Sequence, residues 1–522
     1  MKVRIFLRVF CNLIKYFDKS RGDTRIMNTF MNQLKNDTNF KYTENGGIAH
    51  KTTNSAVYDL FAMGAAYRTR SDADCIFLFK NALEENESLA LKCLFYIRDC
   101  RGGQGERRFF RVCMKWLAQN HPEVARRNLK HIAFFGRWDD LYTFVGTPLE
   151  KDIFDIIKRQ LILDMSCEKN GISLLAKWLK SENASSKETK RLAYITRESL
   201  NITSKTYRQM LSKLRKKINV LERLMSANEW DKIEFDKIPS KAGLIYKNAF
   251  ARRDIIAKKY ESFAKDKKTT VNAGTLYPYE IVQKAIFNKN KSIEDIDRLM
   301  VNKYWENLPN YLENKEDSMM CVVDTSASMW GTPINVAISL GLYCAERLRG
   351  PFANHYISFS RNPQLIETVG IDFVDKVHRI YDTNLCENTN LKGVFDLLLK
   401  TAIKNKVKKE DIPKTIVVIS DMEIDMSTNG WYYEYDRTPW TKYTIDTEME
   451  KVRKEWARCG LELPRLVYWN VDARQNTILD SGPNVSFVSG MSPTIFKSVL
   501  TGKNGYDLML EVIDSQRYSI IK

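Results

Sequence analysis

The chain has 522 residues, of which 44% are hydrophobic and 28% are charged, and its formal net charge at pH 7 is +18. This composition is typical of a globular protein rather than a disordered one, and the length predicts two or more domains. No stretch approaches the roughly 18 consecutive apolar residues that a membrane-spanning helix needs, so we expect a soluble protein with no membrane partner.

The positive charge is confined to the first part of the chain. Residues 1–316 carry 58 Lys and Arg against 38 Asp and Glu, whereas residues 317–522 carry 24 against 26. A surplus of this kind in one region predicts a polyanionic partner, and nucleic acid is the commonest one. Because no helix-turn-helix, zinc finger or basic heptad pattern is present, we favour RNA over duplex DNA.

The N-terminus and the cysteines indicate a cytoplasmic protein. Arg8 interrupts the apolar start and no small-residue cleavage site follows, so we do not expect a signal peptide. We assign residues 1–41 to an N-terminal extension that need not be ordered, within which Met27 is a natural alternative start. The ten cysteines include no C-x-x-C pair, which predicts reduced thiols rather than disulfides or a zinc site.

Residues 55–300 show helical periodicity almost throughout, and we assign residues 42–316 to one helical domain. In ERRFFRVCMKWLAQ and KDIFDIIKRQLI the apolar residues recur on one helical face. The clearest pattern is TYRQMLSKLRKKINVLERLMS, where apolar spacings of four and three alternate from Tyr207 to Met225. We therefore predict an N-terminal all-α array of paired antiparallel helices, similar in kind to a HEAT-repeat solenoid.

From residue 317 to residue 522 short apolar runs alternate with amphipathic segments, which predicts a doubly wound α/β domain with a mostly parallel sheet. Ligands bind such sheets at the carboxyl ends of the strands. The expected strands are 319–324, 355–360, 415–421, 465–472 and 485–490, and the expected helices between them are 333–350, 391–404 and 446–460.

Oxygen-bearing side chains follow two of these expected strands. Asp324, Ser326 and Ser328 form a D-x-S-x-S pattern, Thr389 precedes an expected helix, and Asp421 ends another strand. Hydroxyls with only two carboxylates suit a hard cation, Mg²⁺ or Mn²⁺, rather than Zn²⁺. An isolated D-x-S-x-S is more often a helix or turn cap, but the later threonine and aspartate favour a metal site. A phosphatase of the haloacid dehalogenase type also begins with an aspartate at a strand end, but it needs a second carboxylate two residues further on. This chain has Ser326 at that position, so we disfavour that alternative.

This set resembles the von Willebrand factor A fold with its metal-ion-dependent adhesion site. The resemblance implies coordination by the hydroxyls of Ser326, Ser328 and Thr389, with Asp324 and Asp421 acting largely through bound water. Asn390 departs from the pattern, since related domains often carry an acidic residue after the threonine.

Upstream, the stretches TENGGIAHKTTNSAVYDLFA, YIRDCRGGQGERRFFR, FFGRWDDL, LLAKWLK and KIPSKAGLIYKNAFARRD resemble the TROVE module of Ro-type RNA-binding proteins. The closest likeness is to an uncharacterised branch that carries a C-terminal von Willebrand A domain. The resemblance implies a ring of TROVE-like helices, closed by the A domain, that binds small noncoding RNAs and RNA ends.

Several basic clusters are candidate RNA contacts. The GGQG stretch could bring backbone amides close to phosphate, and Arg137 beside Trp138 pairs a guanidinium with an aromatic ring that a base could stack on. Each cluster taken singly is more often a solvated helix face. The candidates are Arg98, Arg101, Arg107, Arg108, Arg137, Lys213, Arg215, Lys216, Lys217, Arg252 and Arg253.

The sequence thus predicts a Ro-like protein, not an enzyme, that binds small structured noncoding or misfolded RNA through its basic helical half. The alternative is a metal-dependent adaptor whose adhesion site binds an acidic residue of a protein ligand or of a nuclease partner. A nuclease is disfavoured, because no cluster of carboxylates and no catalytic histidine pair accompanies the helices.

Overall fold

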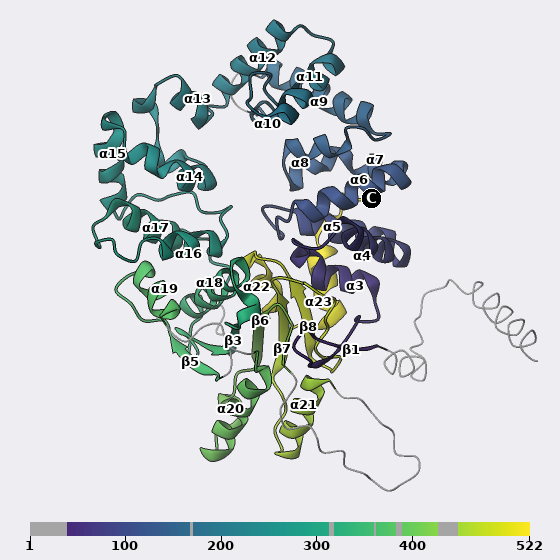
Figure 1. Cartoon of the computed structure of the whole chain (residues 1–522), viewed down its shortest axis with the longest axis vertical. Coiled ribbons are helices and arrows are strands. Elements are labelled where there is room, and N and C mark those ends of the chain that lie inside the picture. The colour runs from purple at the N-terminus through teal and green to yellow at the C-terminus, as the bar shows by residue number, and fades with distance from the viewer. Residues whose placement is uncertain (1–38, 168–170, 313–317, 360–361, 383–388, 426–446) are drawn as a thin grey trace, which may run out of the picture.

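The computed structural model describes residues 39–167, 171–312, 318–359, 362–382, 389–425 and 447–522 (Figure 1). Most of the expected N-terminal extension lies outside the described residues, and the first described strand, β1, spans Phe40–Tyr42. The prediction of an all-α array followed by a doubly wound α/β domain is confirmed by the order of elements.

The array consists of helices that follow one another along an arc from α3 to α17 (Figure 1). Short 3₁₀ segments, the longest at Trp138–Phe144, connect some of them. The helices are α3 Ala56–Met63, α4 Asp72–Glu85, α5 Glu87–Arg98, α6 Arg108–Asn120, α7 Pro122–Asn128, α8 Ile132–Phe135, α9 Glu150–Ser166, α10 Leu175–Trp178, α11 Lys187–Leu200, α12 Ser204–Lys217, α13 Leu221–Ser226, α14 Ser240–Ala251, α15 Asp254–Lys265, α16 Pro278–Ile286 and α17 Ile296–Glu306.

Local sequence sets many helix starts. Ser55, Ser71, Asn86 and Thr203 precede α3, α4, α5 and α12, and each side-chain oxygen accepts a hydrogen bond from a first-turn N–H group. Such caps satisfy backbone donors that a helix leaves unpaired. Positions where a short polar residue precedes an apolar periodic stretch are therefore the points at which these helices begin.

The periodic pattern from Tyr207 to Met225, which predicted one continuous helix, forms two. Helix α12 ends at Lys217 and α13 begins at Leu221. Between them Asn219 has a φ of +49°, a left-handed conformation that cannot continue a right-handed helix and that asparagine tolerates. The apolar spacing survives the break because both helices still bury their Leu side chains in the same core.

The C-terminal domain is a six-stranded sheet with the order β5-β4-β3-β6-β7-β8, in which only β5 runs antiparallel to its neighbour. Helices α20 and α21 lie on one side of this sheet, away from the array (Figure 1). Its elements are β3 Met319–Asp324, α18 Thr332–Arg347, β4 His355–Phe359, β5 Gln364–Glu367, α19 Phe373–Tyr381, α20 Leu391–Lys404, β6 Thr415–Ser420, α21 Glu448–Arg458, β7 Arg465–Asn470, β8 Val485–Ser489, α22 Phe496–Val499 and α23 Gly505–Ile513.

Two short strand features were not expected from the sequence. Strand β5 is largely exposed, so it lacks the continuous apolar run of the central strands. The other is a hairpin of β1 with β2 Ile48–His50, which precedes the array but pairs through His50 with Ile478 of the sheet domain. Its strands of three residues are too short to show an alternating pattern.

The sheet domain closes the arc by binding both of its ends. At the start of the array, the Phe487 N–H donates to the Tyr58 hydroxyl at 2.8 Å. At the end, Arg298 donates two hydrogen bonds to Asp372 at 2.7 and 2.8 Å, and Trp305 stacks on Phe373 with ring centroids 4.1 Å apart. The array and the sheet domain therefore form one closed ring (Figure 1).

A second set of contacts between distant parts of the chain, the inner closure, lies inside the ring at the loop between α5 and α6. The buried Gln104 side chain donates to the Tyr96 hydroxyl at 2.8 Å and accepts from the Ser492 N–H at 3.2 Å. The Gln104 backbone carbonyl accepts a hydrogen bond from the Tyr277 hydroxyl at 3.0 Å. The loop is thus bonded both to the sheet domain and to the far arm of the array.

The C-terminus is anchored at the same loop. Asp99, which is fully buried, accepts hydrogen bonds from the Arg517 guanidinium and from the Tyr518 hydroxyl. The last residue, Lys522, exchanges hydrogen bonds with the Asn128 side chain. The eight cysteines within the described residues are free, as the sequence predicted.

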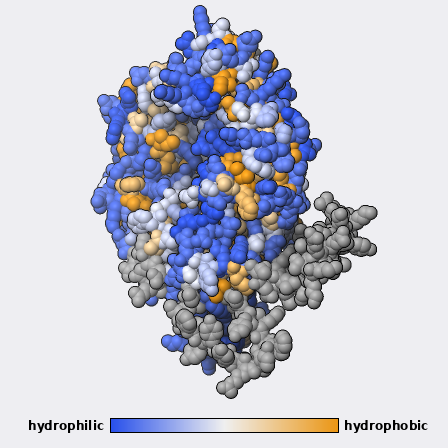
Figure 2. All heavy atoms as spheres, turned by 45° about the vertical axis from the view of Figure 1, so that its right-hand side comes forward, coloured by the Kyte–Doolittle hydropathy of each residue, from blue (hydrophilic) through white to orange (hydrophobic). Residues whose placement is uncertain are grey.

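Figure 2 shows one face of the molecule as mostly hydrophilic, with hydrophobic residues in small separate patches. A large continuous apolar patch would be the usual mark of a protein or membrane docking surface. Across the described ranges, no helix combines the length and the apolar character required to cross a membrane.

The inner closure can be tested with a matched pair of glycine substitutions. Gly105 has a φ of +63° and an added Cβ would overlap the Tyr277 hydroxyl, whereas Gly146 has a φ of +79° with nothing within 4 Å. We expect Gly146→Ala to lower the free energy of unfolding by about 1 kcal/mol, the cost of the backbone alone.

Gly105→Ala should cost clearly more, because it also displaces Tyr277 from the loop. Urea denaturation of both variants and the parent measures the difference. Equal losses of stability in the two variants would show that the Tyr277 contact does not hold the ring together.

Candidate functional site

The predicted metal ligands come together at one edge of the sheet. Strands β3 and β6 are parallel neighbours, so Asp324, the last residue of β3, and Asp421, directly after β6, lie at adjacent carboxyl ends. Both side chains are buried. The hydroxyls of Ser326 and Ser328 lie 3.1 Å apart in the loop that follows β3.

Asp324 is held in a polar but water-poor environment. One of its oxygens accepts the Ser326 N–H at 2.9 Å and the other accepts the Ser420 hydroxyl at 2.5 Å. Burial, together with the nearby charge of Asp421, raises the pKa of Asp324 to about 7. Two neighbouring buried carboxyl groups favour a bound cation, and Arg474 already supplies one positive charge to Asp421.

The N-terminal hairpin covers this edge of the sheet. The Asn45 side-chain amide donates to the Thr389 hydroxyl at 3.2 Å and to the Glu423 carbonyl at 2.6 Å. The Glu44 N–H donates to the Glu423 carboxylate at 2.7 Å. Residues of the turn between β1 and β2 therefore lie directly against one of the five predicted ligands.

Arg474 provides a positive charge at the same place. Its guanidinium contacts the Asp421 carboxylate at 2.7 Å and the Glu44 carboxylate at 2.8 Å, so it bridges the sheet edge and the hairpin. An acidic group from a partner protein would have to displace Glu44, Asn45 and this bridge. Such a cover weighs against the adaptor hypothesis, in which the site grips an acidic residue from outside.

The residues present fit a hard divalent ion. The two aspartates and the Ser326 and Ser328 hydroxyls lie at this edge, and Asn45 connects the Thr389 hydroxyl to it. Among the described residues, the hydrogen-bond partners of the buried Asp324 carboxyl group are Ser326 and Ser420, neither of them a cation. Within the described ranges no group of three or more His, Cys, Asp or Glu gathers as a metal site. A site here therefore depends on the Ser326, Ser328 and Thr389 hydroxyls as well as on the two aspartates.

Metal binding predicts a specific change in thermal stability. An ion that binds only the folded state at about 100 times its dissociation constant stabilises that state by about 2.7 kcal/mol. We expect Mg²⁺ to raise the melting temperature of the parent protein but not of Asp324→Asn or Asp421→Ala, as measured by differential scanning calorimetry.

The control is Asp396→Ala, which removes a carboxylate whose partner is Lys392 on the same helix. This variant should keep the full response to Mg²⁺. An equal Mg²⁺ response in all four proteins would exclude these five residues as the site.

The ring encloses a second candidate site, a cavity of about 1650 Å³. Its lining comes from both arms of the array, from Arg68 on one side to Tyr279 on the other. Twelve Lys and Arg side chains line it against four Glu side chains, together with Trp138, Trp178 and several tyrosines. Part of the basic surplus seen in the sequence therefore lies inside the ring.

Six of the predicted RNA-binding residues line this cavity: Arg98, Arg101, Arg107, Arg108, Arg137 and Arg215. Most of them already have partners within the protein. Arg98 is buried and bonded to Asp140, and Arg215 donates to Ala176, Leu179 and Ser181 at 2.9 Å each. The Arg107 guanidinium is exposed and makes no hydrogen bond or ion pair with the described residues.

The other five predicted residues lie outside the cavity lining. Lys213, Lys216 and Arg252 are exposed. The Lys217 amino group donates to the Cys167 carbonyl at 2.6 Å, and the Arg253 guanidinium lies 4.9 Å from the centre of the Trp230 ring. Of the basic clusters on α12 and around Arg252, only Arg215 therefore reaches the cavity lining.

The GGQG stretch is not a phosphate-binding loop, contrary to the sequence-based expectation. Its backbone N–H groups from Gly103 to Glu106 already donate to the carbonyls of Tyr96, Ile97 and Asp99. Within the stretch only the Gly102 N–H has no acceptor among the described residues, and a single donor does not make a phosphate-binding loop. The glycines instead allow the close packing of the inner closure at Gln104.

The aromatic partner of Arg137 also differs from the expected one. The Arg137 guanidinium lies 4.0 Å from the centre of the Trp178 ring rather than against its neighbour Trp138. Trp178 comes from α10, forty residues further along the chain, so sequence adjacency could not reveal this pair. It follows that Arg137 is held flat at the cavity wall.

Sequence analysis missed half of the basic residues in the lining: Arg68, Lys177, Arg208, Arg223, Lys237 and Lys241. They occur singly rather than in clusters, which is why no local pattern marked them. Lys237 and Lys241 fall within the KIPSK stretch and Lys177 falls within LLAKWLK, and both stretches carried the family resemblance, which was the one signal that pointed to these residues.

Comparisons with known proteins bear on both halves. A family model described as "Domain of unknown function (DUF2828)" matches residues 43–192 and 170–317, and one described as "Domain of unknown function (DUF7788)" matches residues 318–517. "Uncharacterized protein L728" of Acanthamoeba polyphaga mimivirus is 28% identical over 91% of this chain and 87% of its own. The crystal structure of the Deinococcus radiodurans RO (RSR) protein overlays 88% of this chain and 99% of its own, with 10% identity and a TM-score of 0.46, too loosely for any transfer of function.

Proposed function

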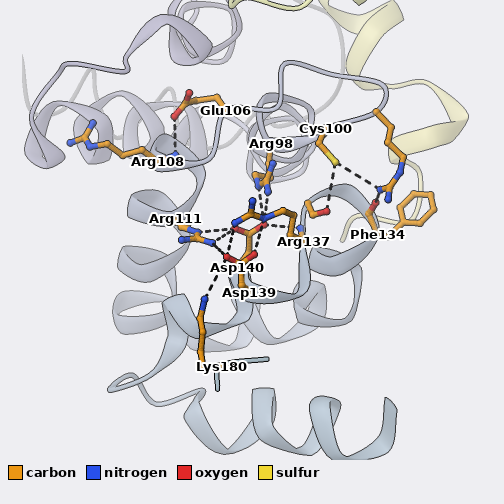
Figure 3. Close-up of polar contacts among 12 residues, drawn as sticks. Arg98, Cys100, Glu106, Arg108, Arg111, Phe134, Arg137, Asp139, Asp140 and Lys180 are labelled. Carbon is orange, nitrogen blue, oxygen red and sulfur yellow. Dashed lines mark hydrogen bonds and ion pairs between the residues drawn. The ribbon is translucent and has the colours of Figure 1, made fainter. Parts of the chain in front are cut away.

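This chain belongs to the DUF2828 family, a domain of unknown function, and we propose that it binds RNA in the cavity of its ring without catalysing a reaction. The observation that carries the proposal is the charge of the cavity lining, twelve Lys and Arg against four Glu. Ion pairs with carboxylates outside the lining, such as Asp140 (Figure 3), Asp72 and Glu229, neutralise part of this charge. The positive charge that remains in the cavity favours a bound polyanion. The phosphate backbone of a small noncoding or structured RNA supplies that charge.

The aromatic residues of the lining support RNA rather than a simple polyanion. The Tyr277 and Tyr279 rings are stacked with centroids 6.0 Å apart, and both line the cavity beside Lys241. Rings next to cationic side chains are the surfaces on which unpaired bases stack. A binding surface of this composition suits an RNA with single-stranded segments, such as an end or a loop of a folded molecule.

We further propose that Asp324, Ser326, Ser328, Thr389 and Asp421 hold Mg²⁺ or Mn²⁺ at the sheet edge. When bound, the ion would neutralise the two aspartates and steady the loops that carry them. These loops lie beneath the hairpin, so the ion's role in this proposal is structural and the RNA site is separate from it. The adaptor alternative, with an acidic protein ligand or a nuclease partner, requires the hairpin to leave.

RNA binding in the cavity predicts a contrast between two triple variants of the full-length protein. Arg208, Lys237 and Lys241 line the cavity, whereas Lys213, Lys216 and Arg252 are exposed outside its lining. Replacing each set with glutamine removes the same charge. We expect the first variant to bind a stem-loop RNA with a single-stranded tail at least about tenfold more weakly, and the second to lose little affinity.

Salt dependence provides the matching measurement. Each phosphate contact that is lost should reduce the slope of log affinity against log salt by about 0.7 to 0.9. The cavity variant should therefore show a shallower slope than the surface variant in a fluorescence anisotropy titration. Equal slopes and equal affinities for the two variants would place the RNA elsewhere or exclude RNA binding.

A further inference from the structure

The turn between β1 and β2 packs directly on the segment that follows β6. Gly46 of the turn forms a backbone bridge with Asp425, and the Thr43 hydroxyl donates to the Ile424 carbonyl at 2.6 Å. A Cβ added at Gly47 would lie 2.7 Å from the same carbonyl oxygen, so glycine is needed for this close approach. The TENGG stretch therefore places the turn against the edge of the sheet that carries the candidate metal ligands.

Asn45 connects this turn to the hydroxyl of Thr389. Its side-chain nitrogen lies 2.6 Å from the Glu423 carbonyl oxygen, which can only accept, so the nitrogen end of the amide faces the sheet. The same nitrogen donates its second hydrogen to the Thr389 hydroxyl at 3.2 Å, and this is the hydroxyl's one hydrogen bond among the described residues. A hydroxyl oxygen has two lone pairs, so the bond fixes the rotation of the threonine side chain and leaves one lone pair for an ion.

The backbone of Thr389 is held by the same segment. The Asp425 N–H donates to the Thr389 carbonyl at 3.0 Å, and Asp425 is the residue that is bridged to Gly46. The turn, the segment after β6 and Thr389 are therefore joined by consecutive hydrogen bonds. Because Asp324 and Ser326 are carried by β3 and its loop instead, a shift of the turn would move Thr389 relative to them.

Glu44 connects the turn to a second candidate ligand, Asp421, through Arg474. The two carboxylates contact the same guanidinium at 2.8 and 2.7 Å. The Glu44 N–H also donates to one oxygen of the buried Glu423 carboxylate at 2.7 Å, and the other oxygen accepts the Thr477 hydroxyl at 2.9 Å. Glu423 therefore anchors the hairpin, although its position two residues after Asp421 is close enough to suggest a metal ligand.

We propose that the turn of the hairpin is part of the metal site, with Asn45 as a positioning residue for Thr389, and that ion binding and docking of the hairpin strengthen one another. This inference rests on the proposed Mg²⁺ site and names what the ion does there. Coupling of this kind is reciprocal, so the factor by which the docked hairpin tightens ion binding is also the factor by which the ion tightens docking. Because the hairpin leads into α3, a divalent cation then sets how firmly the start of the array is held on the sheet domain.

The coupling is measured first on the unmodified full-length protein. Hydrogen exchange of the peptide that spans residues 40–50 is followed by mass spectrometry at saturating Mg²⁺ and after chelation with EDTA. The His50 and Ile478 backbones exchange two hydrogen bonds across the junction, so the His50 amide reports docking directly. We expect exchange to be about tenfold slower with Mg²⁺ in the parent and unaffected by Mg²⁺ in Asp324→Asn. Equal rates with and without Mg²⁺ in the parent would overturn the proposal.

Asn45→Ala tests the positioning role. Asn45 is exposed, so the variant should melt close to the parent without Mg²⁺ but bind Mg²⁺ about tenfold more weakly in isothermal titration calorimetry. The matched control is Lys41→Met, which removes hydrogen bonds from the hairpin to Gln475 and Thr477. It should bind Mg²⁺ at least as tightly as the parent, since it takes away a positive charge and leaves the turn in place. A lower melting temperature with an unchanged dissociation constant in Asn45→Ala would show a merely structural role and overturn the proposal.

Failure of this inference differs from failure of the metal site itself. A parent protein that binds no Mg²⁺ would make both wrong. If the parent binds Mg²⁺ and Asp421→Ala does not, while Asn45→Ala binds it with the affinity of the parent, the five ligands stand and the turn is not part of the site.

Discussion

The structure depends on the loop between α5 and α6, where three distant parts of the chain meet. Asp99 binds Arg517 and Tyr518, 418 and 419 residues away, and Gln104 binds Ser492 and Tyr277, 388 and 173 residues away. Closing loops of this length costs conformational entropy, which buried charged and polar contacts have to offset. The loop is therefore the point at which an arc of helices becomes a closed ring.

Closure of the ring determines the electrostatics of its interior. Helices that would expose their basic residues to solvent in an open array instead turn them toward a common cavity, where water screens them less. Arg107 is the extreme case, since its guanidinium lies near those of Arg111 and Arg137 without a carboxylate partner of its own. A rigid frame that keeps like charges together in this way favours an anionic ligand over an empty cavity.

The sheet domain has a second role besides closing the ring, because the edge formed by the carboxyl ends of its strands is covered by the hairpin that precedes the array. Arg474 joins Asp421 to Glu44, so the N-terminal part of the chain contacts the candidate metal site directly. The ring is thereby fastened at both ends of the chain: the C-terminus binds the α5–α6 loop and the hairpin binds the sheet edge. An ion at that edge would stabilise the same junction.

The sequence by itself determined the two-part architecture, since helical and strand periods of apolar residues are local signals, and it located Asp324 and Asp421 because parallel strands end at one edge. It also located the basic half, but not its binding surface. Lys213 and Arg107 belong to equally basic stretches, yet only Arg107 faces the cavity. Other features depend on contacts between residues far apart in the chain. These contacts decide which cations line the cavity, which of them pair with Asp140, and that Arg137 packs on Trp178. Only the closed tertiary structure creates them.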